Sequence, residues 1–414
     1  MHMKDRNVTV SVEQALRIVL ESVSSLDSED VSILEASGRV LYDDIVADTM
    51  VPPADDSAMD GFALIAGDTS CASRDNPVTL RIAGEVQAGG SIAGNEVSRG
   101  TAVRIMTGAP VPAGADAVIP IEDTEEEHGR VNVFREVPQF ENFRFAGESI
   151  KKGNAVLYRG DRLSSADVGI LASLNRQTVS VYKQPTVAII STGNELADIG
   201  EEIKNGRIRN VNAYTLYSEI KKYSALPEYL GIVRDTVEDT REIFSRALGC
   251  DVVISTGGVS MGKYDFVKDI CPDLGIDIKF GWVRVKPGRP CTFGTKGRKL
   301  VFGLPGNPVS TLTSFIQFVR PALLRLMGAS RIAKPVVSAL LEENLKKPAG
   351  KAHLLRGHFR IENNDFRVST TGNQKSSVLL SMSNANCLII LPENTTEVKA
   401  GERVAIQLID HDET

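Results

Sequence analysis

Three short glycine-rich loops carry the residue types in this chain that are best suited to chemistry. TVAII leads into STGNEL, DVVIS into TGGVSMGKYDF, and KLVFG into LPGNPVSTLTSF, and each loop precedes a helical pattern. Glycines let backbone N–H groups turn toward a ligand, and a helix that begins just beyond them favours an anion. A single such glycine is often needed only for a tight turn. Three loops of this kind on one sheet edge indicate a ligand that carries phosphate.

The second loop also has the spacing of a different phosphate-binding motif. GGVSMGK, residues 257–263, matches the P-loop pattern, which would indicate a nucleotide triphosphatase. However, the next residue is Tyr264, where a P-loop needs Ser or Thr to hold magnesium. Asp265 is better suited to that task, because an aspartate at the end of such a loop can hold Mg²⁺ against phosphate oxygens. Its plainer interpretation is a helix cap.

Other polar residues leave two interpretations open. In KPGR, Lys286 and Arg289 form either a turn with solvated cations or an oxyanion site, with lysine as a point charge and arginine as a fork. Asp60 lies in SAMDGFAL, and Asp-Gly between apolar residues is typical of a hairpin turn. His353 and His358 are five positions apart in a strand-like run, so they point to opposite faces and make a poor metal pair.

Residues 186–327 supply the elements that must position the three loops. TVAII, YLGIV, DVVIS and KLVFGL are apolar runs, and helical patterns such as AYTLYSEIKKY and VEDTREIFSRAL separate them. Buried strands that alternate with helices predict a mostly parallel, doubly wound sheet with helices on both faces. Ligands of such sheets bind outside the carboxyl ends of the strands, which is where the loops begin.

The chain on either side of this region has a different pattern of apolar runs, glycines and prolines. Gly and Pro interrupt residues 51–145 every few positions, and runs such as TAVRIM and DAVIPI predict short strands. Helical patterns begin at Ser11 and span residues 164–174, so the β-rich part can be an insertion in a discontinuous domain. Beyond Ala333, runs such as HLLRGHFRIE and CLIILP predict a compact β domain.

We therefore predict a multidomain fold that combines α/β and β-rich parts. Its centre is a doubly wound, mostly parallel sheet at residues 181–330. A discontinuous linking domain with helices occupies 1–50 and 146–180, a β-rich insertion domain occupies 51–145, and a C-terminal β domain occupies 331–414.

Composition excludes several classes of protein. The 414 residues include 47 Lys+Arg and 53 Asp+Glu, which gives a net charge of -6 without a long block of one sign. A nucleic-acid partner is not expected, because such binding needs a clustered basic face. The 5 cysteines are far apart and form no C-x-x-C pair, which fits a reducing compartment. The start of the chain turns charged at once and no apolar run approaches the ~18 residues of a membrane span, so we expect a soluble, cytoplasmic protein with no membrane partner.

Several segments together resemble one family. PPADDSAMDGFAL, AVRIMTGAPVPAGADAVIP, STGNEL, STGGVSMGKYDF, VKPGRP, GLPGNPVS and TTGNQKSS look like the molybdopterin molybdenumtransferases, which include the C-terminal part of gephyrin. The match runs in order from about residue 10 to 408. The resemblance implies a transferase of molybdenum cofactor biosynthesis that takes adenylylated molybdopterin and molybdate, cleaves the adenylate with Mg²⁺, and leaves molybdenum on the pterin dithiolene as AMP departs.

The resemblance also implies partners. In the family the cleft is shared between the subunits of a homodimer, which would explain functional acidic residues in two different domains. The upstream adenylyltransferase and the molybdoenzymes that receive the cofactor are further partners that it implies. The α/β domain would be the molybdopterin-binding one.

Site residues follow from the same resemblance. The implied catalytic residues are Asp60, Glu195, Asp235, Asp265 and Lys286. Among them Glu195, Asp235 and Asp265 would hold Mg²⁺ and phosphate, while Lys286 would hold the oxyanion together with Arg356 and Ser376. The full set of implied substrate-binding positions is Thr107, Gly108, Thr192, Gly193, Gly257, Gly258, Ser260, Pro305, Gly306, Asn307, Arg356 and Ser376.

Two departures from the family pattern qualify this assignment. Bacterial relatives often show Gly-Glu-Asp where this chain has Gly147-Glu148-Ser149, and many show a second lysine where it has Trp282. Ser149 carries no charge, so catalysis is slower or Glu148 substitutes for it. Trp282 either stacks on the pterin or adenine or only packs.

Two other functions stay open at this point. One is an adenylyltransferase or nucleotide triphosphatase that works through GGVSMGK. The other is a non-catalytic dimeric scaffold, for which the sequence offers no peptide-binding signature.

Overall fold

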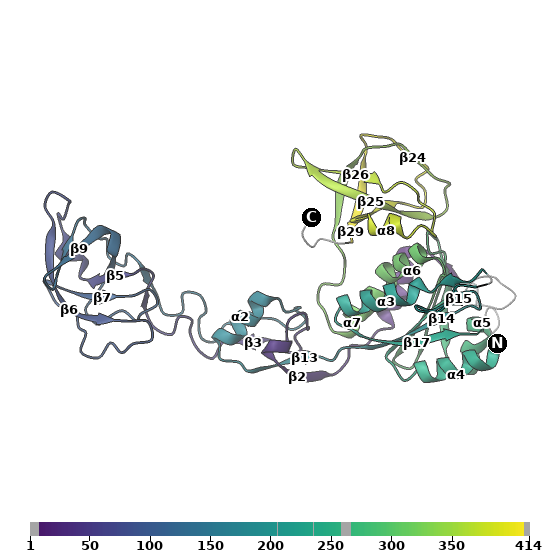
Figure 1. The fold of residues 1–414 in the computed structure, drawn as a ribbon, viewed down its shortest axis with the longest axis horizontal. Coiled ribbons are helices and arrows are strands. Elements are labelled where there is room, and N and C mark those ends of the chain that lie inside the picture. Colours follow the sequence, from purple (N-terminus) through teal and green to yellow (C-terminus); the bar gives the residue numbers. More distant parts are fainter. Residues whose placement is uncertain (1–7, 205, 235, 258–265, 410–414) are drawn as a thin grey trace. The chain divides into compact units, whose positions relative to one another are not determined.

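The chain forms two compact units. The computed structural model describes residues 8–204, 206–234, 236–257 and 266–409. The larger unit comprises residues 1–43, 159–164 and 178–414, and the smaller unit comprises residues 44–158 and 165–177 (Figure 1). The four domain boundaries expected from the sequence stay a prediction.

A seven-stranded sheet forms the centre of the larger unit. Its order is β1-β19-β21-β22-β18-β14-β17. Neighbouring strands pair in parallel except around β21, which is antiparallel to both β19 and β22. The bounds are β1 Thr9–Val10, β14 Thr186–Thr192, β17 Leu226–Val233, β18 Val252–Thr256, β19 Asp277–Val283, β21 Pro290–Lys296 and β22 Lys299–Leu304.

Helices cover both faces of this sheet. In β14, Val187 and Ile189 belong to one apolar core, whereas Ala188 and Ile190 belong to another, because successive side chains of a strand point to opposite faces. The first core contains residues of α1 (Val12–Glu21), α3 (Val211–Lys222), α6 (Pro308–Ser314), the π-helical turn η4 (Phe315–Val319) and α7 (Arg320–Leu326). The second contains residues of α4 (Val237–Ala247) and α5 (Phe266–Asp273). The predicted doubly wound sheet is confirmed.

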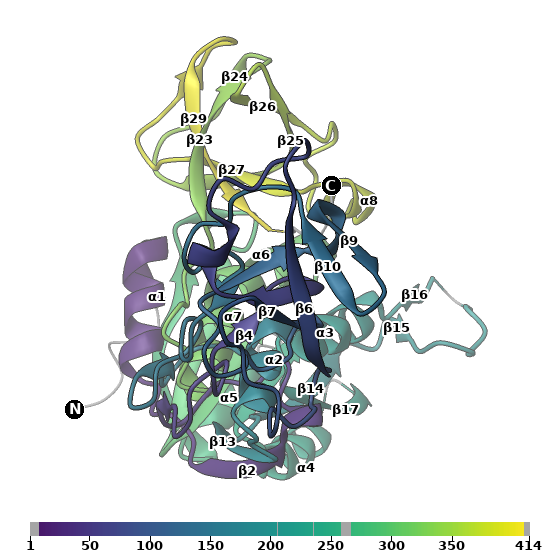
Figure 2. The ribbon, with the colours of Figure 1, turned by 90° about the vertical axis from the view of Figure 1, so that its left-hand side faces the viewer.

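The first helix begins where the sequence indicates. Ser11 is its N-cap: the Ser11 hydroxyl accepts from the Gln14 N–H, and the Gln14 side chain accepts from the Ser11 N–H. Ala15 and Val19 are buried, and the helix packs against α7 and η4 (Figure 2).

The strand order creates a reversal point beside β14. The chain passes from β14 through α3 to β17 on one side, then through α4 to β18 on the other side. Open sheets bind ligands at such a point, at the carboxyl ends of the strands. The segment that follows β14 projects from the sheet and contains two short paired strands, β15 (Leu196–Ala197) and β16 (Ile208–Arg209) (Figure 2).

The C-terminal part is a closed barrel. The ring runs β25-β26-β23-β29-β27 and closes through the pairing of β27 with β25. A sixth strand, β20 (Val285–Lys286), leaves the α/β region and pairs in parallel with β25, which sets Lys286 opposite His353. This bridge places the KPGR segment between the sheet and the barrel. The bounds are β23 Val336–Leu341, β24 Leu345–Lys346, β25 Ala352–Glu362, β26 Asp365–Thr370, α8 Leu380–Ser383, β27 Cys387–Leu391, β28 Glu397–Val398 and β29 Arg403–Leu408.

The rest of the larger unit is a short ribbon. It pairs β2 (Ser28–Ser32) with β13 (Thr178–Tyr182), and the turn η1 (Ile33–Glu35) follows β2. Among the residues that the structure describes, no helix is both long and apolar enough to cross a membrane.

The smaller unit is β-rich, as predicted. Its main sheet has the order β8-β5-β7-β6-β10-β9, and the helix α2 (Ser165–Ser173) lies in the same unit. The strands of the sheet are β5 Gly61–Leu64, β6 Val78–Val86, β7 Thr101–Ile105, β8 Ala117–Pro120, β9 Thr124–Glu127 and β10 Arg130–Val133. The remaining elements are β3 Ile45–Val46, β4 Asp56–Ser57, η2 Ala66–Thr69, η3 Ile121–Asp123, β11 Phe143–Arg144 and β12 Ala155–Leu157.

Asp60 lies in a turn, as its Asp-Gly pattern indicates, but this turn does not belong to a hairpin. Asp60 lies in the bend between β4 and β5, but β4 pairs with β11, while β5 pairs with β7 and β8. The two strands that flank the Asp-Gly pair therefore belong to different sheets, and long-range pairing has overridden the local turn signal.

Candidate active site

A cavity of about 390 Å³ lies at the carboxyl ends of β14, β18 and β22. It occupies the reversal point of the sheet, and all three glycine-rich loops contribute to it. We call it the sheet-edge crevice. Its lining residues are Thr192, Glu195, Leu196, Ile208, Asn212, Thr256, Gly257, Pro290, Pro305, Gly306 and Asn307.

Two glycines let the crevice loops approach each other closely. Gly257 has φ +85°, and a Cβ at this position would lie 2.5 Å from the backbone oxygen of Thr192. Gly193 has φ +140°, and a Cβ there would lie 2.5 Å from a carboxylate oxygen of Glu195. Both positions have a conformation that suits glycine; at Gly257 the near atom is backbone, so there is no room for a side chain, whereas at Gly193 a side chain would displace the Glu195 carboxylate. The glycines therefore set the position of the Glu195 carboxylate and the width of the crevice.

Hydrogen bonds join the loops to one another. The Thr192 hydroxyl donates to the Thr256 carbonyl at 3.2 Å, and the Asn212 amide nitrogen donates to the Gly306 carbonyl at 2.8 Å. The amide oxygen of Asn212 is buried and has no partner among the described residues. The first turn of α3 is thereby connected to the loop that follows β22.

A tyrosine–carboxylate network supports the projecting segment behind the crevice. The Tyr229 hydroxyl donates to Asp198 at 2.9 Å, and Tyr214 donates to the same carboxylate. Burial opposes ionisation of Asp198, but these hydrogen bonds lower its pKa overall. Asn210 donates to the Tyr229 oxygen at 2.8 Å and accepts from the Ser191 hydroxyl at 3.1 Å. The network fixes the start of α3 relative to the end of β14.

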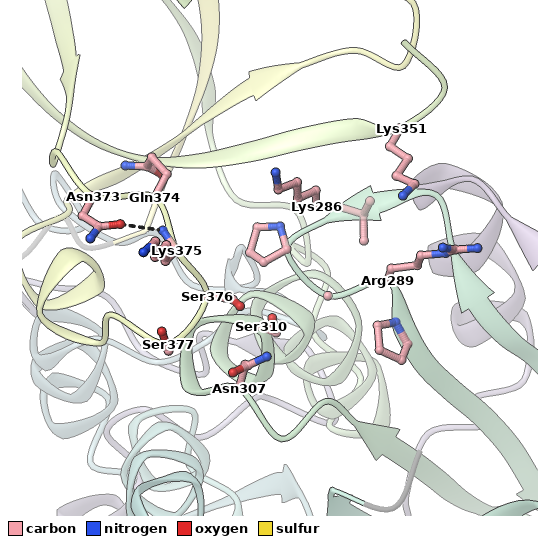
Figure 3. A pocket seen from close by; sticks show the side chains of 14 residues that line it. Lys286, Arg289, Asn307, Ser310, Lys351, Asn373, Gln374, Lys375, Ser376 and Ser377 are labelled. Atoms are coloured by element: carbon pink, nitrogen blue, oxygen red, sulfur yellow. Dashed lines mark hydrogen bonds between the residues drawn. The ribbon is translucent and has the colours of Figure 1, made fainter. Parts of the chain in front are cut away.

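A second cavity, of about 730 Å³, lies where β20 joins the barrel. Among the residues that the structure describes, four cationic side chains and no carboxylate line it, so we call it the cationic basin (Figure 3). Pro290 and Asn307 line both cavities, which makes the basin and the crevice neighbours. The lining residues are Val285, Lys286, Pro287, Gly288, Arg289, Pro290, Asn307, Ser310, Lys351, Asn373, Gln374, Lys375, Ser376 and Ser377.

Arg356 lies behind the basin rather than on its surface. It is only 1% exposed, and its guanidinium donates to the carbonyls of Asn373 and Lys375, both at 3.3 Å, and to the Ser381 hydroxyl at 3.1 Å. Burial lowers its pKa to about 10. Arg356 therefore holds the loop that carries Ser376, and no carboxylate among the described residues neutralises its charge.

The positive charge of the basin also acts on His353. This imidazole is buried beside Lys286 on the neighbouring strand. Burial, followed by the charges of Lys286, Lys347 and Lys351, lowers the pKa of His353 to about 4. His353 is therefore neutral at pH 7, and the basin keeps a net excess of cations. Within the described residues, no group of three His, Cys, Asp or Glu side chains forms a metal cluster.

Three implied site residues lie together in the smaller unit. Asp60 accepts from the Thr107 N–H at 2.6 Å and from the Thr107 hydroxyl at 2.8 Å, and these two bonds lower its pKa. Gly108 has φ +79° and donates its N–H to the Ser57 carbonyl at 2.8 Å. The MDGF and MTGAP segments thus form a single loop cluster. In the same unit, Ser149 is exposed, and the Glu148 carboxylate accepts from the Phe145 N–H at 3.0 Å.

The structure brings together most of the implied residues of the larger unit. Thr192, Glu195, Gly257, Pro305, Gly306 and Asn307 line the crevice, and Lys286, Asn307 and Ser376 line the basin. Asp235, Gly258, Ser260 and Asp265 lie outside the described residues, as does most of the GGVSMGK loop.

Comparisons with known proteins cover the whole chain in order. Family models match at residues 10–175 (MoeA N-terminal region, domain I and II), 188–325 (probable molybdopterin binding domain) and 338–409 (MoeA C-terminal region, domain IV). The molybdopterin molybdenumtransferase of Haemophilus influenzae is 36% identical over 97% of this chain and 99% of its own length. The enzyme of that name from Bacillus subtilis is 34% identical over 98% of this chain and 96% of its own length. The chain belongs to the molybdopterin molybdenumtransferase family.

A solved structure supports the same assignment. The molybdopterin biosynthesis moeA protein from Pyrococcus horikoshii OT3 matches with a TM-score of 0.82 and 33% identity, over 97% of this chain and 100% of that one. The protein is thus a molybdopterin molybdenumtransferase family member in sequence and in fold, and an enzyme of the transferase class in molybdenum cofactor biosynthesis.

Sequence reasoning missed several lining residues of this family member. Ser310 lies inside the quoted GLPGNPVS segment but received no role, and Asn212 and Lys351 lie outside every quoted motif. The Arg289 guanidinium lies over the Trp282 ring, 5.1 Å from the centroid, and stacking of this ring on the pterin or adenine stays a prediction. Only the fold makes these contacts visible.

Proposed function

We propose that this protein inserts molybdenum from molybdate into adenylylated molybdopterin, with Mg²⁺ as cofactor and AMP as a product. The observation that carries the proposal is a cationic basin that shares Pro290 and Asn307 with a glycine-lined crevice, in a chain of this family. A tetrahedral dianion and a phosphate-bearing pterin need two adjoining sites with these different linings.

The basin suits molybdate. Lys286 offers a point charge, and the hydroxyls of Ser310 and Ser376, which lie close to each other, offer donors (Figure 3). The buried guanidinium of Arg356 adds positive charge behind the Ser376 loop without itself lining the cavity. We infer that Lys286, Ser310 and Ser376 contact the oxyanion and that Arg356 holds their loop in place.

The crevice suits the adenylate. Its walls are loops whose backbone N–H groups are suitable donors for phosphate oxygens. The carboxylate of Glu195 lies on the same wall, where Gly193 leaves room for it. A hard carboxylate oxygen fits Mg²⁺, so Glu195 would hold the metal with Asp235 and Asp265, which lie outside the described residues. Bound Mg²⁺ would offset the negative charge of the phosphate oxygens during cleavage of the adenylate.

The proposal includes a homodimer with a shared cleft, to which Asp60 and Thr107 of the smaller unit would contribute. It also includes a cytoplasmic location. The upstream adenylyltransferase and the molybdoenzymes that accept the cofactor are the proposed partners.

The test is AMP release from adenylylated molybdopterin with Mg²⁺, with and without molybdate. We expect molybdate-dependent release by the wild type. Loss of one charge-assisted contact in Lys286→Gln should raise the KM for molybdate by about tenfold to 100-fold. Lys296→Gln is the matched control, because Lys296 is exposed and lies outside both cavities. Release that does not depend on molybdate, or a Lys286→Gln variant with wild-type kinetics, would count against the proposal.

A further inference from the structure

Two cations of the basin lie apart from its serine-rich wall. Figure 3 shows Arg289 and Lys351 on the side of the cavity opposite Lys375, Ser376 and Ser377. Neither side chain forms an ion pair with a carboxylate in the part of the chain that the structure describes. The oxyanion contacts proposed above use neither of them.

Arg289 is held in place by an aromatic ring. The pairing of β19 with β21 sets Trp282 opposite Pro290, and the Arg289 carbonyl accepts from the Val283 N–H at 3.0 Å. The Arg289 guanidinium consequently stacks on the Trp282 ring, 5.1 Å from its centroid. Stacking orients the planar fork while leaving its edge N–H groups available to a ligand. The ring contact restricts the position of the Arg289 guanidinium, whereas the ammonium of an unsupported lysine moves on a flexible stem.

Lys351 is carried by a loop with a rigid base. The Lys347 side chain is buried, and its ammonium donates to the carbonyls of Lys351 at 2.8 Å, Glu393 at 3.1 Å and Pro348 at 3.4 Å. The Ala352 N–H donates to the Arg284 carbonyl at 3.0 Å, which joins this loop to the strand before KPGR. The backbone of Lys351 is therefore fixed relative to Arg289.

The charge balance leaves room for a second anion. Lys286, Arg289, Lys351 and Lys375 bring four positive charges to one cavity, whereas molybdate brings two negative charges. The low pKa of His353 follows first from burial and then from the charges of Lys286, Lys347 and Lys351, which is consistent with this excess. A cavity of about 730 Å³ is also far larger than one tetrahedral oxyanion requires. Unpaired cations at this density favour a further group with negative charge.

We propose that Arg289 and Lys351 form a second anion subsite of the basin, which holds a phosphate group of the pterin substrate while Lys286, Ser310 and Ser376 hold the oxyanion. Trp282 is the positioning residue of this subsite, because it acts through Arg289. The inference rests on the proposed function and extends it. It also gives Trp282 a role that the replacement of a lysine at this position would otherwise leave unexplained.

The first experiment separates the two subsites by their kinetics. Arg289→Gln and Lys351→Gln should each raise the KM for adenylylated molybdopterin by about tenfold and change the KM for molybdate by less than about threefold. Ser376→Ala should show the reverse pattern, and Lys296→Gln should leave both constants unchanged. An equal rise of both KM values in Arg289→Gln would overturn the inference, because Arg289 would then belong to the oxyanion site. Unchanged values would overturn it as well.

The second experiment does not depend on the reaction. Phenyl phosphate, a phosphate monoester, is titrated calorimetrically into the wild type and the variants. Arg289→Gln and Trp282→Leu should weaken its binding, the latter to a smaller extent, and Trp282→Phe should restore it because the ring face returns. Weakening by Arg289→Gln would support the subsite even if no AMP release were found, in which case only the proposed function would fail. Equal binding to the wild type and Arg289→Gln would overturn the subsite itself.

Discussion

The sheet-edge crevice and the cationic basin touch each other but are built differently. The crevice comes from loops at one edge of one sheet, and the chemistry of its described residues comes from backbone groups and the carboxylate of Glu195. The basin comes from a bridging strand, the start of α6 and two loops of the barrel, and its chemistry comes from long cationic side chains. One site depends on close backbone approach, and the other depends on how side chains are supported from behind.

This difference predicts different sensitivities. In the crevice, the critical quantity is the distance between loops, so Gly257 should tolerate no replacement. In the basin, the critical quantity is the placement of charge, so the buried supports Arg356 and Lys347 should matter as much as the exposed cations do. Asn307 and Pro290 line both cavities, so a change at either residue should affect both sites.

The largest expected effect is on the crevice. In Gly257→Ala the new Cβ would meet the Thr192 carbonyl oxygen at 2.5 Å, at a residue with φ +85°. Because the loops must separate, we expect AMP release to fall by more than about 100-fold. The free energy of unfolding should fall by about 1–3 kcal/mol, as for other overpacked sites. Steady-state kinetics and urea denaturation measure the two effects.

Gly169→Ala is the matched control for that variant. Gly169 lies within α2, and a Cβ there has no heavy atom within 4 Å. Helix propensity predicts a gain of about 0.5–1 kcal/mol in unfolding free energy, with activity unchanged. If Gly257→Ala behaved like Gly169→Ala, the close approach of the loops would have no functional role.

A smaller effect is expected behind the basin. Arg356→Met would leave the carbonyls of Asn373 and Lys375 without their donor, at a cost of about 1–3 kcal/mol. The loop that carries Ser376 would then lose its support, and the KM for molybdate should rise by about tenfold. The Mg²⁺ dependence should not change, because Glu195 lies in the other cavity.

Arg360→Met is the matched control for Arg356→Met and tests whether any arginine on this strand affects the KM for molybdate. Arg360 lies on the same strand, β25, but is exposed and pairs with Glu342 at the surface. Both the unfolding transition and the KM for molybdate should stay as in the wild type. A molybdate KM that rises equally in the two variants would show that β25, rather than the buried guanidinium, supports the basin.

The two cavities also differ in how far the sequence predicts them. The crevice was predictable, because each of its loops follows an apolar strand directly and parallel strands end at one edge. Of its lining residues, Asn212 could not be assigned, since its contact with Gly306 joins positions 94 residues apart. For the basin, the KPGR pattern left an oxyanion site at Lys286 and Arg289 as one of two interpretations, and the family resemblance pointed to Lys286 and Ser376.

The supports of the basin show why the rest could not be predicted. The sequence gives no sign that Lys347 is buried under three carbonyls or that Trp282 lies under Arg289, because both contacts depend on how the barrel and the sheet meet. Asp60 illustrates the opposite error. Its local pattern indicates a hairpin, but pairing with distant strands decides the outcome.

The smallest expected effect is on the pH dependence of stability, which should respond to a ligand in the basin but not to one in the crevice. Burial and the basin lysines lower the pKa of His353 from 6.5 to about 4, so the unfolded chain binds this proton between these pH values and the native protein does not. Stability contributed by neutral His353 is therefore complete above pH 6.5 and is lost as pH falls toward 4.

In urea titrations across this range, the free energy of unfolding of His353→Gln should fall less steeply with falling pH than that of the wild type. Molybdate should make the wild-type curve shallower too, because an anion in the basin favours the charged imidazole, whereas Mg²⁺ in the crevice should not. A wild-type curve that molybdate leaves unchanged in slope would mean that the oxyanion binds elsewhere.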